Sequence, residues 1–273
     1  MIQWYPGHMA KALREIEEGL RLVDLVMILV DARIPFSSIN PELMKTIGSK
    51  ASLFILTKAD KADSNQTKAW CTKLSGENKS AISINAKNAT TKKQVLHAVD
   101  VLMKPWHEKN ASKGLRKRAV RTMVVGIPNV GKSTLINVLA GRKAASVGDK
   151  PGVTKTQQWI KIGDELELLD TPGVLWPKFE SSTTGFNLAL TGAIKDEVVP
   201  LEDLAIYAIN IINEKAPGAI KSRYGIGTTD ALLVIKELLD LKKTGDENKI
   251  YHLIINDYRS NAFGNLTLED ANG

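Results

Sequence analysis

The sequence predicts an α/β fold built on a parallel sheet, followed by a smaller helical domain. Two unbroken apolar runs, at residues 25–30 and 53–56, are each followed by a polar residue and are separated by a short helical segment. Such runs are typical of strands buried on both faces of a parallel sheet. A third observation is a glycine-rich loop, residues 126–134, between the apolar run 123–125 and a helix-like segment. This order of strand, loop and helix is the setting of a phosphate-binding loop.

The composition fits a globular protein with a sizeable core. Of the 273 residues, 43% are apolar and 25% are charged, and the length allows one large domain or two smaller ones. The single cysteine, Cys71, excludes an internal disulfide and suits a reducing compartment. No apolar run approaches the ~20 residues that cross a bilayer, and residues 1–11 lack the pattern of a signal peptide. We expect a cytoplasmic protein without membrane contact, and we expect it to be a monomer.

The charge favours a polyanionic partner. The net charge is +7 and the pI is ≈ 9.3, which makes nucleic acid the first candidate and an anionic membrane surface the second. Positive charge is densest at residues 104–121, where seven lysines or arginines stand against one acid, Glu108. Such a run is most often a solvated linker, and an RNA contact is the alternative.

The first 24 residues contain one expected helix, at residues 11–22, because Leu13, Ile16 and Leu20 recur there at helical spacing. Before it, His8 follows a Pro-Gly turn, a position where histidine is usually a surface or capping residue.

The strand at residues 53–56 is followed by Thr57-Lys-Ala-Asp60, which resembles the guanine-reading N-K-x-D motif of GTPases. Asp60 can accept hydrogen bonds from the N1–H and the exocyclic amine of guanine, which adenine does not offer. The stem of Lys58 would pack over the base. Thr57 replaces the usual asparagine, which supports the base and ties the motif to the phosphate loop, so the substitution puts nucleotide affinity in question. The alternative is a solvated lysine–aspartate pair at a strand end.

A third strand, at residues 80–84, ends in Asn85, Ala86 and Lys87. This tripeptide resembles the S-A-K loop whose backbone N–H contacts guanine O6. A helix is expected next, at residues 92–102.

The phosphate loop assigns a role to each of its residues. Gly126 and Gly131 let backbone N–H groups point at phosphate oxygens, and the following helix adds its positive dipole end. Lys132 would reach the β- and γ-phosphates, and the Ser133 hydroxyl would bind Mg²⁺. The alternative is a chance glycine-rich turn. The loop residues expected to touch the nucleotide are Asn129, Val130, Gly131, Lys132, Ser133 and Thr134.

Two further elements would surround the γ-phosphate. Residues 148–154 have the composition of a mobile turn, and Thr154 would close on Mg²⁺ and the γ-phosphate. An Asp-Thr-Pro-Gly motif follows an apolar strand, so Asp170 would hold Mg²⁺ through water and the Gly173 N–H would meet the γ-phosphate. The strands between them are expected at residues 158–162 and 165–169.

The order of these motifs is unusual, because the base-reading elements precede the phosphate loop, whereas in most GTPases they follow it. The sequence therefore resembles a circularly permuted GTPase with a Ras-like domain, and it closely resembles the ribosome biogenesis GTPase A family of bacteria. The resemblance spans nearly the whole chain. It is carried by Trp4-Tyr-Pro-Gly-His-Met-Ala-Lys11, Asp31-Ala-Arg-Ile-Pro35, Gly126-Ile-Pro-Asn-Val-Gly-Lys-Ser133, Leu169-Asp-Thr-Pro-Gly-Val-Leu-Trp-Pro177 and Thr191-Gly-Ala-Ile194.

The resemblance implies a GTP hydrolase that assists late assembly of the large ribosomal subunit by binding its RNA. It also implies that the histidine of the Pro-Gly-His motif, His8, is catalytic, in addition to Lys132. Residue 174 is Val, where Ras-like enzymes have the glutamine that positions the attacking water. Permutation brings the new N-terminus beside the γ-phosphate, so His8 can replace that glutamine; a structural cap is the alternative. Asn129 resembles the asparagine of GTPases that use K⁺, although an ordinary loop asparagine fits as well.

The domain boundaries are expected at residues 1–176 for the permuted GTPase domain and 177–273 for the helical domain. Amphipathic spacing predicts three helices in the second part, at residues 201–213, 229–242 and 248–261. A nucleotide-gated switch that binds RNA or the ribosome with negligible catalysis is the alternative function, and Val174 is the feature that supports it. A GTPase of membrane traffic or tRNA modification is less favoured, because no lipidation signal is present.

Overall fold

A computed structural model describes residues 8–144, 158–171, 173, 175 and 181–272, without the side chains of residues 8–13 and 158. The elements up to residue 170 are α1 (His8–Leu20), β1 (Leu25–Asp31), α2 (Pro41–Ile47), β2 (Ala51–Thr57), the 3-10 turn η1 (Ala59–Lys61), α3 (Ser64–Leu74), β3 (Lys79–Ser83), α4 (Thr91–Ser112), β4 (Val120–Gly126), α5 (Lys132–Ala140), β5 (Gln158–Ile162) and β6 (Leu166–Asp170). The later elements are α6 (Ser182–Leu190), the 3-10 turn η2 (Asp196–Val198), α7 (Leu201–Lys215), α8 (Ala219–Tyr224), α9 (Ala231–Lys242) and α10 (Glu247–Arg259).

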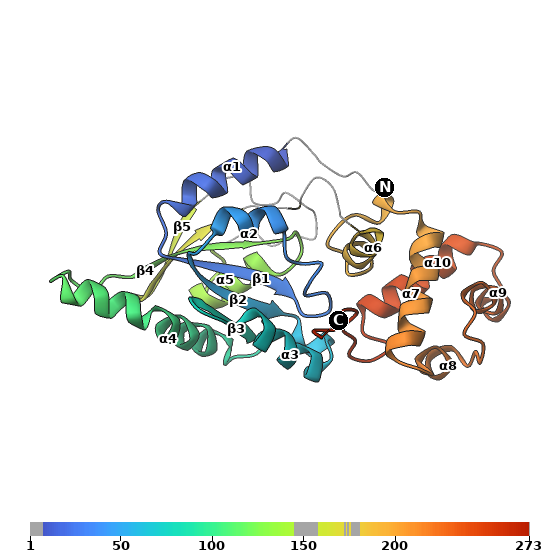
Figure 1. Ribbon diagram of the computed structural model, residues 1–273. Coiled ribbons are helices and arrows are strands. Elements are labelled where there is room, and N and C mark those ends of the chain that lie inside the picture. Colours follow the sequence, from blue (N-terminus) through green and yellow to red (C-terminus); the bar gives the residue numbers. More distant parts are fainter. Residues whose placement is uncertain (1–7, 145–157, 172, 174, 176–180, 273) are drawn as a thin grey trace.

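The strands form one six-stranded sheet in the order β3-β2-β1-β4-β6-β5, in which β5 is antiparallel to β6 and the other pairs are parallel. The chain moves outward from β1 through β2 to β3, and it then returns to the centre of the sheet for β4. Helices α1 and α2 lie together on one face, and α4 and α5 lie together on the other (Figure 1). The point where the strand order reverses, between β1 and β4, is where open α/β sheets bind ligands.

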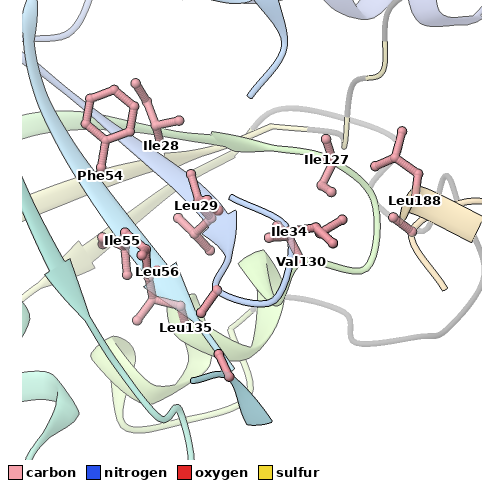
Figure 2. Close-up of a cluster of buried hydrophobic side chains, with 14 of the residues drawn as sticks. Ile28, Leu29, Ile34, Phe54, Ile55, Leu56, Ile127, Val130, Leu135 and Leu188 are labelled. Carbon is pink, nitrogen blue, oxygen red and sulfur yellow. The ribbon is translucent and has the colours of Figure 1, made fainter. Parts of the chain in front are cut away.

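All five strands expected from the apolar runs, and the phosphate-loop strand, are present. The buried pattern of β1, in which all seven residues are buried, confirms that a continuous apolar run marks a strand covered on both faces. Figure 2 shows why: Ile28 and Leu29 of β1 and Phe54 of β2 belong to one buried cluster.

The helix after β3 is much longer than expected. We predicted residues 92–102 and a linker from 104 onward, but α4 runs through Pro105 to Ser112. A proline inside a helix removes one backbone hydrogen bond, and the residues that follow it here sustain the helix beyond that gap. The linker expected over residues 104–121 was therefore wrong for its first half, and only residues 113–119 connect α4 to β4 without regular structure.

The helices after residue 181 pack around α7 and α10, which contact each other along their lengths (Figure 1). Two of them, α6 and α8, were missed because they are short, with nine and six residues. Helix α6 also enters the core beneath the phosphate loop, where Figure 2 places Leu188 with Ile34 and Val130. The expected boundary at residues 176 and 177 lies outside the described residues, so the division into two domains stays a prediction.

The last residues return to the sheet side of the molecule. The Leu268 N–H donates to the Arg33 carbonyl at 2.8 Å, and the Leu266 N–H donates to the Lys61 carbonyl at 3.2 Å. The indole N–H of Trp70, on α3, donates to the Glu269 carbonyl at 2.9 Å. The C-terminal tail, defined here as residues 265–272, therefore joins the helical part to the elements that follow β1 and β2.

Within the described residues, no helix is long and apolar enough to cross a membrane.

A buried ion cluster closes the end of β1. The Asp31 carboxylate accepts two hydrogen bonds from the Arg33 guanidinium, at 2.9 and 2.7 Å, and one from the Lys58 ammonium at 2.9 Å. Asp31 and Arg33 are only 2% and 3% exposed. Burial alone would raise the pKa of Asp31, but the two cations outweigh it and hold that pKa well below its usual range. The buried Asp31–Arg33 pair therefore stays charged at neutral pH.

Replacing Asp31 by asparagine is expected to lower the free energy of unfolding by about 3–5 kcal/mol, because the buried Arg33 guanidinium would lose its counter-charge. Urea denaturation measures this loss. The matched control is Asp24→Asn, whose partner Arg118 is half exposed, and a loss within about 1 kcal/mol is expected there. Equal losses of unfolding free energy in the two variants would show that the buried cluster stabilises the protein no more than an exposed ion pair does.

Candidate functional site

The predicted site residues gather along one edge of the sheet. Strands β2, β1, β4 and β6 are parallel neighbours, so their carboxyl ends lie side by side. These ends carry Thr57, Asp31, Gly126 and Asp170. Four segments distant in sequence therefore meet at the topological switch point of the sheet.

Backbone geometry at the phosphate loop requires glycine. Gly126 has φ +155°, and a Cβ atom there would lie 2.8 Å from the Leu29 carbonyl oxygen on the neighbouring strand. Gly131 has φ +107° and caps α5 without a side-chain hydrogen bond. Because Gly131 offers no side chain to accept hydrogen bonds from the first N–H groups of α5, these groups can donate to a bound anion.

The other loop residues divide into those that offer side chains and those that offer backbone. Val130 is 1% exposed with its side chain in the core, so it can offer only backbone groups (Figure 2). Asn129 adopts the left-handed region with φ +55°, which asparagine tolerates better than most residues. Ser133 is half-buried and Thr134 is exposed, both in the first turn of α5.

Lys132 is held inside the loop. Its ammonium donates to the carbonyls of Gly126 and Ile127, at 3.0 and 2.9 Å, and the residue is 8% exposed. Burial lowers the pKa of Lys132 to about 8, and the nearby Asp170 carboxylate offsets part of that effect. A phosphate anion at the loop would stabilise the charged ammonium, so anion binding and protonation of Lys132 are coupled.

The Asp-Thr-Pro-Gly motif is fastened to the phosphate loop. The Thr171 hydroxyl donates to the Val124 carbonyl of β4 at 2.6 Å. A Cβ atom at Gly173 would lie 3.0 Å from both the Lys132 ammonium nitrogen and the Pro128 Cα atom, so the loop leaves no room for a side chain there. The sequence reasoning missed Thr171, although its position between Asp170 and proline was a usable signal.

Two oxygen ligands fit a magnesium ion. The Asp170 carboxylate, 1% exposed, ends β6, and Ser133 lies in the first turn of α5, which follows the neighbouring strand β4. A carboxylate and a hydroxyl are hard oxygen donors of the kind Mg²⁺ prefers, and the phosphates of a nucleotide supply the rest. The donor set is therefore compatible with Mg²⁺.

Thr57 connects its motif to the phosphate loop, which is the role that the usual asparagine has at this position. Its hydroxyl oxygen lies 2.7 Å from the Val130 carbonyl of the phosphate loop and 3.2 Å from the Val30 carbonyl of β1. Because the hydroxyl has a single proton, the shorter contact is the better hydrogen bond. The base-reading motif and the phosphate loop are thus joined directly, by a residue that is 3% exposed.

The remaining residues that we predict to read the base follow Thr57. Lys58 has φ +56° and directs its ammonium to Asp31 at 2.9 Å, while Asp60, in η1, is exposed. In the next loop, the Asn85 side chain accepts a hydrogen bond from the Lys87 N–H at 2.9 Å, which holds the half-buried Ala86 in a tight turn. Asp60 is therefore open to a base, and the Asn85–Lys87 loop has a fixed shape.

Three predicted residues cannot be placed. The side chain of His8, although α1 begins at this residue, lies outside the described residues, as do Thr154 and Val174.

The Thr-Gly-Ala-Ile turn at residues 191–194 borders the site, which the sequence did not predict. The Asn129 side-chain amide donates to the Gly192 carbonyl at 2.9 Å, and the Arg33 guanidinium donates to the Thr191 carbonyl at 3.2 Å. In the sequence the turn is only one part of a family resemblance, because nothing in its composition indicates that Gly192 lies next to Asn129, 63 residues earlier.

Replacing Thr57 by valine is expected to weaken guanine nucleotide binding by roughly fivefold, or about 1 kcal/mol, because the buried Val130 carbonyl loses its donor. Displacement of a fluorescent GDP analogue measures the affinity. Thr57→Ser is the matched control, since it keeps the hydroxyl and should bind within about twofold of the wild type. Loss of binding in both variants alike would contradict the proposed tie.

Nucleotide affinity is expected to be constant below about pH 8 and to fall as the pH rises from 8 to 9. In the free protein Lys132 loses its proton near pH 8, and the bound phosphates require the charged form, so binding takes up a proton above that pH. Calorimetry in two buffers of different ionisation enthalpy counts the protons. Lys132→Arg cannot titrate in this range, and any proton uptake that it retains would assign the effect to another group.

Comparison with known proteins agrees with this geometry. The family described as "50S ribosome-binding GTPase" matches residues 121–256. The protein named Ribosome biogenesis GTPase A from Bacillus cereus is 46% identical over 98% of this chain and 94% of its own length, and its namesake from Bacillus licheniformis is 46% identical over 98% of both chains. The GDP-bound structure of YlqF from T. maritima shares the fold, with a TM-score of 0.67 over 95% of this chain and 100% of that one, at 24% identity. The chain belongs to the ribosome biogenesis GTPase A family, whose circularly permuted GTPase fold it has.

Proposed function

We propose that this GTPase assists late assembly of the bacterial large ribosomal subunit by binding its RNA in a nucleotide-dependent manner. The observation that carries the nucleotide part is the 2.7 Å hydrogen bond from Thr57 to the Val130 carbonyl, which joins a guanine-reading motif to a phosphate loop. The ribosomal part rests on the names of the relatives, and it makes the cytoplasm the expected location.

The chain's own residues divide the work on GTP. Asp60 would pair with the guanine edge, and the stem of Lys58 would cover the base. Lys132 would exchange its two loop carbonyls for phosphate oxygens, which stabilises charge on the transferred phosphoryl group. Ser133 and Asp170, joined by Thr154, would hold Mg²⁺. When bound, this ion neutralises charge on the phosphates.

The group that positions the attacking water is proposed to be His8. Val174, just after the Asp-Thr-Pro-Gly motif, has no hydrogen-bonding atom, so another residue must do this. In the permuted chain α1 begins at His8 and precedes β1, the strand next to the phosphate-loop strand. An imidazole can accept the water proton in the way a general base requires.

Potassium is proposed as a second ion, on the strength of Asn129 in the phosphate loop. The Asn129 amide nitrogen donates to Gly192, which fixes the side chain at the loop where a K⁺ ion would neutralise charge in place of an arginine finger. Exchange of K⁺ for Na⁺ in a hydrolysis assay is the direct test.

Family membership favours a hydrolysing enzyme over a switch with negligible catalysis. The experiment is single-turnover GTP hydrolysis with and without large ribosomal subunits, for the wild type and His8→Ala. We expect subunits to accelerate the wild type, and His8→Ala to slow the accelerated reaction by ~10²–10⁴-fold with nucleotide affinity unchanged, because His8 would touch the water and not the ground-state nucleotide.

Two outcomes would contradict the proposal. Absence of any acceleration by subunits would remove the ribosomal role. Equal rates for wild type and His8→Ala would eliminate the histidine and point to a group supplied by the subunit. Lys132→Ala is the control that should remove most phosphate binding, because a charge-assisted contact is worth about 1.5–3 kcal/mol or more.

A further inference from the structure

A groove lies at the amino ends of the parallel strands, opposite the nucleotide edge. It has a volume of about 540 Å³ and is bounded by the end of α4, by residues 115–118 and by Asp24. A neighbouring hollow of about 660 Å³ shares Asp100, His107, Lys117 and Arg118 with it and reaches the start of β6. Strand β4 begins at Val120 beside this groove and ends at the phosphate loop, so the two sites are about 20 Å apart at ~3.3 Å per residue.

The floor of the groove is rigid and aromatic. The Arg118 guanidinium donates to both Asp24 carboxylate oxygens, at 2.7 and 2.9 Å, and lies 5.0 Å from the centre of the Trp106 ring. The rings of Trp106 and His107 meet edge to face at 4.9 Å. Arg118 therefore holds the half-buried indole in place, and Trp106 still lines the groove.

The rim of the groove is positively charged. The cations on the last two turns of α4 and on the connection to β4 are exposed, and within the described part of the chain none of them forms an ion pair. Of these cations, Lys104, Arg116 and Lys117 line the groove, and Lys109 and Lys113 lie on the same stretch outside its lining. The acids of the groove are Asp24, which Arg118 neutralises, and Asp100 and Glu108, which the three remaining cations of the lining outnumber.

We propose that this groove binds an unpaired RNA segment, with a base against Trp106 and its phosphates on the rim lysines and Arg116. The aromatic ring and the positive rim together indicate the partner. Positive charge alone would suit any polyanion, whereas a flat recessed ring beside a positive rim is the arrangement that holds the splayed bases of single strands. The inference rests on the proposed ribosomal function for the source of the RNA. It adds a second contact surface on the edge of the sheet away from GTP.

The geometry also separates two kinds of cation. Arg118 is bound to Asp24, and Arg121 lies 3.4 Å from Glu167, so neither is available to phosphate as Arg116 and Lys117 are. The basic run is thus part scaffold and part contact surface, and a test must leave Arg118 intact.

The test uses the full-length protein and a fluorescent single-stranded RNA of about ten nucleotides in an anisotropy titration at several salt concentrations. The variant Arg116→Gln/Lys117→Gln should bind at least tenfold more weakly at low salt. Its slope of log K against log salt should be smaller by about 1.4, since each single-strand phosphate contact contributes about 0.7. Lys45→Gln/Lys68→Gln, which removes two exposed lysines from α2 and α3, is the control and should leave both quantities unchanged.

A second pair of variants tests the aromatic floor. Trp106→Leu should weaken RNA binding at least fivefold without changing the salt slope, and Trp106→Phe should restore most of the affinity because it keeps a ring. Circular dichroism verifies that each variant is folded. A 4-thiouridine RNA should cross-link within residues 104–118.

The outcomes are distinct. Unchanged affinity and slope in the Arg116/Lys117 variant, with cross-links elsewhere, would overturn the inference. So would displacement of the RNA by polyglutamate as readily as by unlabelled RNA, because the groove would then bind acidic protein by charge alone. Because no ribosome is present, the result does not depend on whether subunits stimulate hydrolysis, and either proposal can fail without the other.

Discussion

The architecture of the site depends on the hydrogen bonds that the Asp31 carboxylate accepts from Arg33 and Lys58. Asp31 ends the most buried strand and receives Arg33 from its own loop and Lys58 from the base-reading motif. Isolated burial of the Asp31 or the Arg33 charge would cost several kcal/mol, so these two residues stabilise each other, and the partly exposed Lys58 adds a second cation. Because Arg33 also donates to the Thr191 carbonyl, the same cluster fixes the position of α6 relative to the sheet.

Permutation of the motif order leaves the three-dimensional relation of the motifs intact. The phosphate-loop strand β4 still lies at the centre of the sheet, with the base-reading strands on one side and the Asp-Thr-Pro-Gly strand on the other. The C-terminal tail makes contacts between the helical part and the sheet. Glu269 of the C-terminal tail accepts hydrogen bonds from the Ser37 N–H and from the Asn187 amide of α6, and burial raises its pKa. The helical part is thus fastened at both ends to the loops that surround the nucleotide edge.

The two edges of the sheet differ in how they are built. At the carboxyl edge, charged side chains are buried and paired with one another, which gives fixed geometry for one small ligand. At the amino edge, exposed cations lie beside the rings of Trp106 and His107, which suits a long and variable polyanion. Strand β4 connects the two edges, so RNA in the proposed groove and a nucleotide at the phosphate loop would not compete for one surface.

The sequence by itself determined the strands, the phosphate loop, the Asp-Thr-Pro-Gly motif and the family, because each depends on local periodicity or on residues adjacent in the chain. The tertiary structure alone decided that Thr57 replaces asparagine in reaching the Val130 carbonyl, that Arg118 is a scaffold residue, and that α4 continues past Pro105. These facts depend on which distant groups become neighbours. Side-chain hydrogen bonds across 27 to 158 positions, such as those of Lys58 with Asp31 and Arg33 with Thr191, leave no periodic trace in a sequence, since any of many donors could have met the same acceptor.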